Sequence, residues 1–414
     1  MSGILYFSHQ QLKQVRALGQ VVKLGFMKIF IIAGEESGDI LGADLMASLQ
    51  TKYKKHDFIF RGIGGTRMQA QGLSSLFPMQ ELSLMGIAEI LPKVPHLLKR
   101  IRQAAESVET FQPDILMTID SPDFSFRVAK QIKKRNLDVP LKVHYVAPTV
   151  WAWRPGRAKK IAALYDAILC LFPFEPPYFK KEGMEAAFIG HPMSKLLEGI
   201  TPEAFIKKYD LAECAAKVGV LFGSREGEIS RMAETFIGAV KQITNEFENP
   251  CIICPTLPHL REKVDNIINT YKDDMTCRFL VTSDEGEKYQ AMAACDVAVA
   301  TSGTVGLELA VLGVPHVIGY KVNALTYEIG KRLITTKYAH LGNIILQEEI
   351  IPEFIQHDCT AENIAANILG MLEGNMLNSD LDESFRLIRQ AIRGPDGASP
   401  SDVAADYIMS KFSS

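Results

Sequence analysis

The sequence lacks long apolar runs, a marked excess of charge and an ordered set of cysteines. None of its apolar stretches approaches the ~18–20 residues needed to cross a bilayer, so no transmembrane helix is expected. A net charge of −3 argues against bulk electrostatic binding to nucleic acid. The seven cysteines are scattered and odd in number, which is typical of a reducing cytoplasm. Cys251 and Cys254 form a C-x-x-C pair without a second ligand pair, so no metal site is expected.

Length and apolar content predict two globular domains after a short extension. A chain of 414 residues is too long for one ordinary core, and a hydrophobic content of 47% is that of a globular protein. Residues 1–26 lack the long apolar core and the cleavage site of a secretory signal. Met27 then opens an apolar run typical of a first strand. We therefore expect Met27 to be the working start of the chain and residues 1–26 to be an extension.

From Met27 onward, short apolar runs alternate with amphipathic stretches of helix length, the pattern of βαβ units and parallel sheets. A first series of strands is predicted at 28–33, 58–62, 115–119, 142–146, 167–171 and 186–189. A second series follows a break near 190–192, at 218–222, 251–254, 278–281, 296–300 and 314–318. The sequence thus predicts an α/β fold of two doubly wound domains, 27–192 and 193–390, with ligands at strand ends and in the cleft between the halves. In the last segment, 391–414, Ser399 is expected to cap a final helix.

The most informative stretch is 300–310, a small hydroxyl-rich turn between an apolar strand and an apolar helix. This order places backbone N–H groups and the positive end of a helix dipole at the edge of a sheet, where a diphosphate could bind. Glu308 lies one helical turn past Thr304 and could accept the two hydroxyls of a ribose. The alternative is an ordinary connection in which Ser302 or Thr304 caps the helix and Glu308 is solvated.

Two further stretches in the second half end predicted strands in the same way. Gly223, Ser224 and Arg225 form a glycine turn, from which Arg225 could reach a diphosphate leaving group. Tyr320 ends a later strand, and Asn343 lies at the centre of a loop.

Carboxylates follow two strands of the first half. Glu35 and Glu36 lie in the glycine turn after the first strand, where Ser37 or Asp39 could cap the next helix. Asp120 and Asp123 follow a later strand, and either could act as a general base toward a hydroxyl group. Asp123 is also well placed as a helix cap, which favours Asp120 for chemistry.

Two apolar segments of the first half admit two interpretations each. Residues 81–102 carry an apolar helical stripe with lysine and arginine beside it, and Pro92 and Pro95 should interrupt or kink the helix. The segment is either a core-facing helix pair or a surface that dips into an anionic membrane. Trp151, Trp153 and Arg154 form either a well-packed loop or an aromatic wall with a basic group for phosphate.

Together, eight motifs resemble the lipid-A-disaccharide synthase family, in the same order from Met27 to the C-terminus. They are GEESGD at 34–39, RMQAQG at 67–72, LMGI at 84–87, IDSPDF at 119–124, VWAWR at 150–154, FIGHP at 188–192, GSR at 223–225 and SGT at 302–304. The resemblance implies a metal-independent GT-B glycosyltransferase with two Rossmann-like domains and without a cofactor. It implies the inverting transfer of 2,3-diacylglucosamine from UDP to the 6-hydroxyl of 2,3-diacylglucosamine 1-phosphate (lipid X).

The resemblance also implies roles for individual residues. Asp120 and Glu35 would be the catalytic carboxylates, without a decision on which is the general base. The UDP-binding residues would be Gly223, Ser224, Arg225, Ser302, Gly303, Thr304, Glu308, Tyr320 and Asn343. The acceptor or lipid side would comprise Met85, Ile87, Trp151, Trp153 and Arg154.

The same family likeness implies a cytoplasmic protein of a Gram-negative cell, bound peripherally to anionic phospholipid at the inner face of the membrane. The last helices would return to the first domain, within one chain or between the subunits of a homodimer. Phe222 and Gly342 stand where the family commonly has proline, and the run 347–349 replaces a usual glycine. The alternatives are a non-catalytic paralogue that binds UDP-sugar or lipid, and another GT-B enzyme that uses a UDP-sugar.

Overall fold

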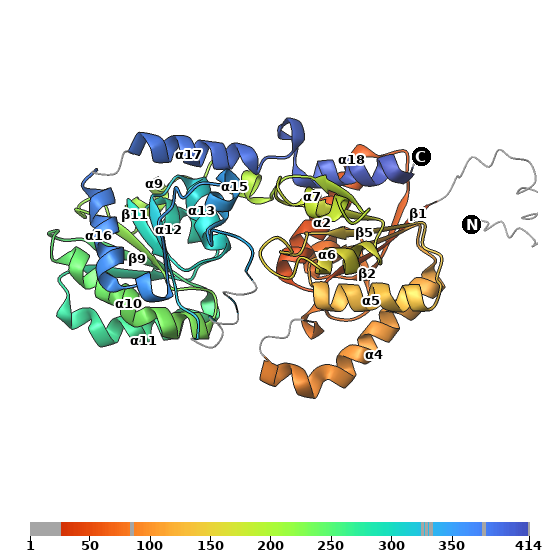
Figure 1. Ribbon diagram of the computed structural model, residues 1–414, viewed down its shortest axis with the longest axis horizontal. Coiled ribbons are helices and arrows are strands. Elements are labelled where there is room, and N and C mark those ends of the chain that lie inside the picture. The colour runs from red at the N-terminus through yellow and green to blue at the C-terminus, as the bar shows by residue number, and fades with distance from the viewer. Residues whose placement is uncertain are drawn as a thin grey trace, which may run out of the picture. The chain divides into compact units, whose positions relative to one another are not determined.

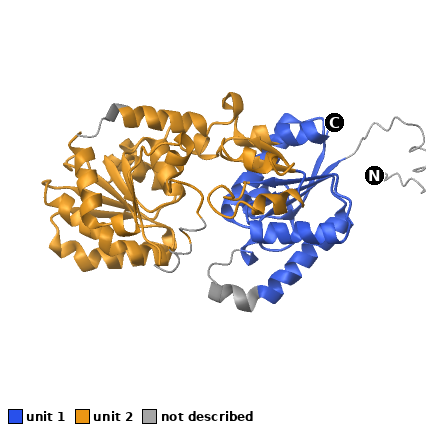
Figure 2. Cartoon of the chain, in the orientation of Figure 1, with its two compact units in different colours: residues 1–145, 164–166, 405–414 blue, residues 146–163, 167–404 orange. Residues whose placement is uncertain are grey.

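The computed structural model describes residues 26–82, 87–323, 327, 330, 334–374 and 378–412, apart from the side chains of 87–93 and 378–379. The expected extension lies outside the described residues except for Phe26. The chain divides into two compact units, coloured separately in Figure 2: residues 1–145, 164–166 and 405–414, and residues 146–163 and 167–404. Within the described ranges, no helix combines the length and the apolarity needed to cross a membrane.

The first sheet has seven strands in the order β3-β2-β1-β4-β5-β6-β7 (Figure 1). Its strands are β1 (Met27–Ala33), β2 (Phe58–Ile63), β3 (Ser74–Ser75), β4 (Ile115–Ile119), β5 (Leu141–Tyr145), β6 (Ala167–Cys170) and β7 (Glu185–Phe188). The pairs β1–β2, β1–β4, β2–β3, β4–β5 and β6–β7 are all parallel. Chain order reverses between β1 and β4, which is where a doubly wound sheet opens a crevice at its carboxyl edge.

The helices of this part alternate with the strands. They are α2 (Glu36–Lys52), α3 (Thr66–Ala70), η1 (Met79–Glu81), α4 (Ile87–Phe111), α5 (Pro122–Lys134), α6 (Arg157–Ala162) and α7 (Pro176–Lys180). Side chains of α4 and α5 share one core with β1 and β4, including Phe30, Ile101, Leu116 and Val128. These strands are apolar on both faces because helices cover both.

The second sheet has six strands in the order β10-β9-β8-β11-β12-β13. They are β8 (Lys217–Leu221), β9 (Cys251–Pro255), β10 (Arg278–Thr282), β11 (Val297–Ala300), β12 (His316–Tyr320) and β13 (Glu353–Ile355). All five pairs are parallel, and the order reverses between β8 and β11. The α/β architecture with two doubly wound sheets is therefore confirmed.

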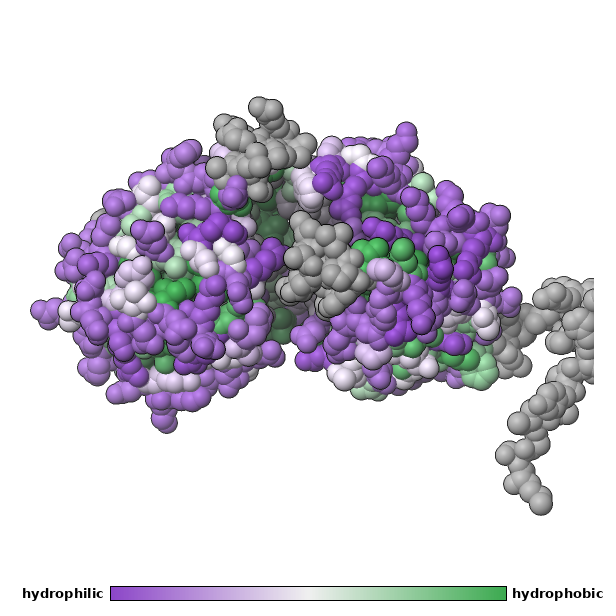
Figure 3. Space-filling view, turned by 90° about the horizontal axis from the view of Figure 1, so that it is seen from below, coloured by the Kyte–Doolittle hydropathy of each residue, from purple (hydrophilic) through white to green (hydrophobic). Residues whose placement is uncertain are grey.

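The second sheet also has helices on both faces. The helices after α7 are α8 (Met193–Leu196), α9 (Glu203–Lys208), α10 (Glu226–Thr244), η2 (Pro258–Leu260), α11 (Arg261–Tyr271), η3 (Lys272–Asp274), α12 (Lys288–Ala293), α13 (Thr304–Leu312), α15 (Leu341–Leu346), η4 (Gln356–Asp358), α16 (Ala361–Leu372), α17 (Asn378–Ala391), η5 (Pro395–Gly397) and α18 (Pro400–Phe412). Helices α10, α11 and α16 share a core with the strands through residues such as Phe236, Val264 and Ile364. Figure 3 shows that the visible face is mainly hydrophilic, as expected for these amphipathic helices.

Some local expectations are confirmed and others are wrong. Ser399 caps the last helix, since its Oγ accepts the N–H of Asp402 at 3.1 Å. Pro92 and Pro95 do not interrupt α4, which runs as one helix from Ile87 to Phe111, so that part of the expectation is wrong, and the kink stays a prediction. The short strands β3 and β13 were not predicted, because two or three residues are too few to show a periodic pattern.

Asp39 stabilises a different helix from the one expected. Helix α2 begins at Glu36, and the Asp39 carboxylate, only 4% exposed, faces the N-terminus of α3. It accepts N–H groups from Gly65 at 2.7 Å, Arg67 at 3.0 Å and Met68 at 3.1 Å. A first-turn residue of one helix thus satisfies the unpaired N–H groups of another.

We expect Asp39→Ala to lower the free energy of unfolding by about 2–4 kcal/mol, because three buried N–H groups lose a charged acceptor. Urea denaturation followed by circular dichroism measures this loss. Asp44→Ala is the matched control, since Asp44 lies in the same helix and is exposed. Equal losses in the two variants would contradict the assignment.

Candidate functional site

The second unit has a pocket of about 310 Å³ at the carboxyl ends of β8 and β11, the point where the strand order reverses. Its lining comes from the loops after β8, β9 and β11, from the start of α12 and from α13. The lining residues are Leu221, Gly223, Ser224, Arg225, Glu228, Pro255, Thr256, Leu257, Lys288, Thr301, Ser302, Gly303, Thr304, Val305 and Glu308. Seven of the nine expected UDP-binding residues are therefore gathered in one pocket.

The loop after β8 is held in place by Glu228, which sequence reasoning missed. Gly223 has a φ of 119°, and a side chain there would meet Glu228 Cβ at 2.9 Å. Glu228 accepts the Ser224 N–H at 3.1 Å and lies 3.4 Å from the Arg225 guanidinium. Burial, and then the nearby charge of Glu228, raises the pKa of Tyr320, while 72% of the Arg225 side chain is exposed. The sequence signal that could have identified Glu228 is an acidic residue in the first turn of the helix that follows the glycine turn.

The loop after β11 presents the N-terminus of α13 to the pocket. Gly303 is the N-cap residue and has a φ of 153°, so neither Ser302 nor Thr304 has the predicted capping position. In the described part of the chain, no side chain hydrogen-bonds this N-terminus as a cap. Ser302 Oγ instead donates to the Ala339 carbonyl at 3.2 Å. The first N–H groups of α13 and the dipole of the helix therefore suit an anion.

Glu308 is buried at the floor of this pocket, with 7% of its surface exposed, so the solvated alternative is wrong. Lys288 Nζ lies 2.8 Å from Oε1 with hydrogen-bond geometry and 2.7 Å from Oε2 as an ion contact. The Tyr289 hydroxyl lies 3.4 Å from Oε1. Oε2 receives no hydrogen bond of good geometry among the described residues. Lys288 was missed because it lies on another helix, far from the motif in sequence.

Asn343 lies outside the pocket lining and organises its own loop. Its side chain is fully buried. The Oδ1 atom accepts N–H groups from Ile350 at 3.0 Å and Ile351 at 2.9 Å, and Nδ2 donates to Ile351 O and Glu353 Oε1, both at 2.8 Å. The amide therefore fastens the segment that carries the Ala339 carbonyl rather than pointing into the pocket.

Two buried histidines pack beneath α13. His316 Nδ1 lies 2.7 Å from the Val314 carbonyl and therefore carries the proton. Its Nε2 accepts from His340 Nε2 at 3.1 Å, and His340 Nδ1 accepts the Gly342 N–H at 2.9 Å. A proline at 342 could not donate this bond. His340 also blocks any side chain at Gly306 of α13, since a Cβ there would lie 2.5 Å from its ring.

In the first unit, the loops after β1 and β4 meet at the point where the strand order reverses. Gly34 makes this approach possible, since a Cβ there would lie 2.4 Å from Ser121 Oγ. Asp120 and Ser121 have φ values of 51° and 45°, a left-handed pair that is uncommon outside glycine. Asp120 is partly buried and accepts the Ser121 N–H at 2.8 Å, with Ser37 Oγ 3.4 Å from its Oδ2. Glu35 precedes α2 as its N-cap residue and is exposed.

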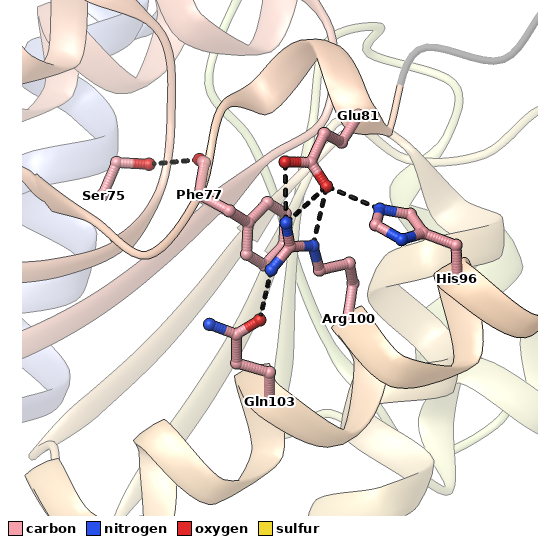
Figure 4. A network of polar contacts seen from close by, with 6 residues as sticks. All are labelled: Ser75, Phe77, Glu81, His96, Arg100 and Gln103. Carbon is pink, nitrogen blue, oxygen red and sulfur yellow. Dashed lines mark hydrogen bonds and ion pairs between the residues drawn. The ribbon is translucent and has the colours of Figure 1, made fainter.

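A polar network ties the middle of α4 to Glu81 of η1 (Figure 4). Arg100 makes two hydrogen bonds of 2.7 Å to the Glu81 carboxylate, lies over the Phe77 ring and donates to Gln103. His96 Nε2 lies 2.6 Å from Glu81 Oε2. Hydrogen bonds from Arg100, and then from His96, hold the pKa of Glu81 below its usual range despite partial desolvation.

The predicted apolar stripe of this helix divides between core and surface. Ile101 is buried, whereas Val94 is 37% and Leu98 is 43% exposed. Met85 lies outside the described residues, and so does the side chain of Ile87. Neither of the two interpretations therefore holds for the whole stripe.

The tryptophan loop also divides. Trp151 is 7% exposed, donates its indole N–H to Glu175 at 3.1 Å and meets Phe174 edge to face. Burial raises the pKa of Glu175 to about 7, against the hydrogen bonds that favour its charged form. Trp153 is 38% exposed, and the Arg154 guanidinium lies 4.2 Å from its ring centre. The structure thus packs Trp151 into the interior and leaves Trp153 and Arg154 at the surface.

Comparisons with known proteins identify relatives along nearly the whole chain. A family model described as lipid-A-disaccharide synthetase matches residues 29–396. The lipid-A-disaccharide synthase of Ruegeria pomeroyi is 41% identical over 391 residues, covering 93% of this chain and 96% of the relative. That of Rhodospirillum centenum is 38% identical over 383 residues, covering 92% and 94%.

Solved structures with low sequence identity share the fold. A UDP-N-acetylglucosamine 2-epimerase from Neisseria meningitidis bound to UDP-GlcNAc has a TM-score of 0.58 at 11% identity, covering 93% of this chain and 99% of that one. MurG of Acinetobacter baumannii has a TM-score of 0.54 at 14% identity, covering 93% and 100%. The two sheets and these neighbours establish the GT-B fold.

Acid should destabilise the histidine pair. Burial lowers the pKa of His316 to about 4 and that of His340 to about 3, so the native state binds fewer protons than the unfolded state. The contribution of the neutral histidines to the free energy of unfolding is therefore fully present above pH ~6.5. It is lost as the pH falls toward these pKa values, by about 1.4 kcal/mol per histidine at pH ~5.5.

We expect His316→Phe to reduce the loss of unfolding free energy between pH 7.5 and 5.5, measured by urea denaturation at both pH values. His357→Gln is the control, because His357 is exposed. An unchanged pH dependence in His316→Phe would show that the pair does not carry the effect.

Proposed function

Because this chain belongs to the lipid-A-disaccharide synthase family, we propose that it transfers 2,3-diacylglucosamine from UDP to the 6-hydroxyl of lipid X. The products are the β-1,6 disaccharide 1-phosphate and UDP. The enzyme is a glycosyltransferase of lipid A biosynthesis that uses a UDP-sugar. The observation that carries the proposal is the pocket between β8 and β11, where a glycine turn, an arginine and the uncapped N-terminus of α13 meet.

The donor would bind in this pocket by its diphosphate and ribose. The first N–H groups of α13 and the exposed Arg225 would hold the diphosphate and stabilise the charge that develops on the leaving UDP. The buried Glu308 would accept the ribose hydroxyls. Tyr320 and Asn343 would act indirectly. Tyr320 lies near Glu228, and Asn343 holds the loop whose Ala339 carbonyl accepts the Ser302 hydroxyl.

Catalysis would require a base on the acceptor hydroxyl. Asp120 and Glu35 follow β4 and β1, the strands on either side of the crevice in the first sheet. The left-handed backbone at Asp120 is the kind of local strain that accumulates at functional sites. An inverting displacement needs one such carboxylate behind the attacking oxygen, and we propose Asp120 for this role.

The lipid side would include the surface of α4. Val94 and Leu98 are exposed next to Lys99 and Arg102, a combination that favours contact with anionic phospholipid. Met85 and Ile87 precede them in the chain. Trp153 and Arg154 would contact the acceptor, with the buried Trp151 holding their loop. Peripheral binding at the inner face of the cytoplasmic membrane would follow.

The functional division would be an acceptor domain at 27–192, a donor domain at 193–390 and a returning segment at 391–414. Lys52, the last residue of α2, and Tyr53 directly after it hydrogen-bond Asp406 of α18 at 2.6 and 2.7 Å, which supports the return of the last helix within this chain. A homodimer stays a prediction. The non-catalytic paralogue and the other GT-B enzymes are not favoured, given relatives of one name at 34–41% identity.

The reaction is tested with purified protein, UDP-2,3-diacylglucosamine and lipid X in mixed detergent micelles. We expect stoichiometric release of UDP and a disaccharide 1-phosphate identified by mass spectrometry. UDP-GlcNAc with the same acceptor is the control for the acylated donor. Binding of UDP without any disaccharide would refute the proposed transfer.

Asp120→Asn should lower kcat by about 10²–10⁴, because the amide cannot accept the proton of the acceptor hydroxyl. UDP affinity measured by calorimetry should be unchanged, since the donor pocket lies in the other unit. Asp123→Asn is the control from the same loop and should stay within a few-fold of the parent. If Glu35→Gln rather than Asp120→Asn abolishes the acid limb of the kcat–pH profile, Glu35 is the base.

A further inference from the structure

The pocket contains one ion pair that the family motifs do not include. Lys288 opens α12, and Glu308 lies in the middle of α13. The two side chains are 33% and 9% exposed, and both line the pocket. A lysine that contacts both oxygens of a buried carboxylate restrains the rotamer of that side chain.

The position of Lys288 is itself fixed from the neighbouring helix. Glu287, directly before it, is hydrogen-bonded by Tyr209 at 2.8 Å and is paired with Lys208, next to Tyr209 at the end of α9. Glu287 is also the N-cap residue of α12, so the first turn of that helix is tied to α9. Lys288 therefore approaches Glu308 from a rigid support rather than from a free loop.

The Glu308 carboxylate can accept further hydrogen bonds besides the one from Lys288. Lys288 donates to Oε1, and its contact with Oε2 lacks hydrogen-bond geometry. Oε2 is buried, and Glu308 is one of the residues that line the pocket. A carboxylate with an open buried oxygen is costly without a donor, and a vicinal diol supplies two O–H donors.

We propose that Lys288 is a positioning residue that orients Glu308 for the ribose hydroxyls of the donor and thereby makes the pocket selective for ribonucleotides. This inference rests on the proposed function, in which Glu308 binds the ribose. Without Lys288, Glu308 loses the hydrogen-bond donor that holds its carboxylate in one orientation. The lost affinity is then specific to ligands that carry the diol.

The test compares UDP with 2′,3′-dideoxyuridine diphosphate by calorimetry on the full chain. The parent should bind UDP at least tenfold more tightly than the dideoxy analogue. Lys288→Met should weaken UDP on the order of tenfold and leave the dideoxy analogue within twofold, while Lys288→Arg restores UDP binding. In turnover, Lys288→Met should raise KM for the UDP-sugar with kcat nearly unchanged, because positioning acts on binding.

Lys263→Met is the matched control, since Lys263 has 32% exposure, pairs with Glu226 and lies on α11 outside this pocket. Equal weakening of both nucleotides in Lys288→Met, or none, would overturn the inference. Failure of the parent to bind UDP would instead overturn the proposed donor site. Thermal melting of each variant separates these outcomes from a loss of folding.

Discussion

The pairing of β1 with β4 and of β8 with β11 is the constraint on which both candidate sites depend. At each pair the chain order reverses, so the connections on the two sides leave in opposite directions. The loops that remain at the carboxyl edge carry Glu35 and Asp120 in the first sheet, and Arg225 and Ser302 in the second. Neither set is contiguous in sequence. Each becomes a set because two parallel strands are hydrogen-bonded side by side.

Glycine permits two close approaches, one between the loops after β1 and β4 and one between the loop after β8 and the first turn of α10. Gly34 leaves room for Ser121, and Gly223 leaves room for Glu228, where any side chain would overlap. The left-handed φ of Gly223 adds a conformational reason for the same residue type. Burial of the apolar strands between helices stabilises the fold and offsets the conformational strain of these turns.

Carboxylates hold the loops and side chains around the pocket in place. Glu228 holds the loop after β8, Glu353 accepts the N–H groups of Ala339 and His340, and Glu308 pairs with Lys288. Each acid accepts hydrogen bonds from backbone or side-chain donors. In the proposed function, the first N–H groups of α13 and the exposed Arg225 receive the diphosphate of the donor.

The sequence by itself determined the eleven longer strands, the two doubly wound sheets and the motifs that line the pocket, because a buried parallel strand needs a continuous apolar run and a turn at its end. Only the tertiary structure decided the partners of those motifs. Asp39 caps α3 instead of its own helix, Trp151 packs inside while Trp153 lies at the surface, and Lys288 reaches Glu308 from another helix. The physical reason is that hydrogen bonds and ion pairs depend on distances of a few ångströms between elements far apart in the chain. Periodicity reports which side of an element is buried, but not which side chain it meets there.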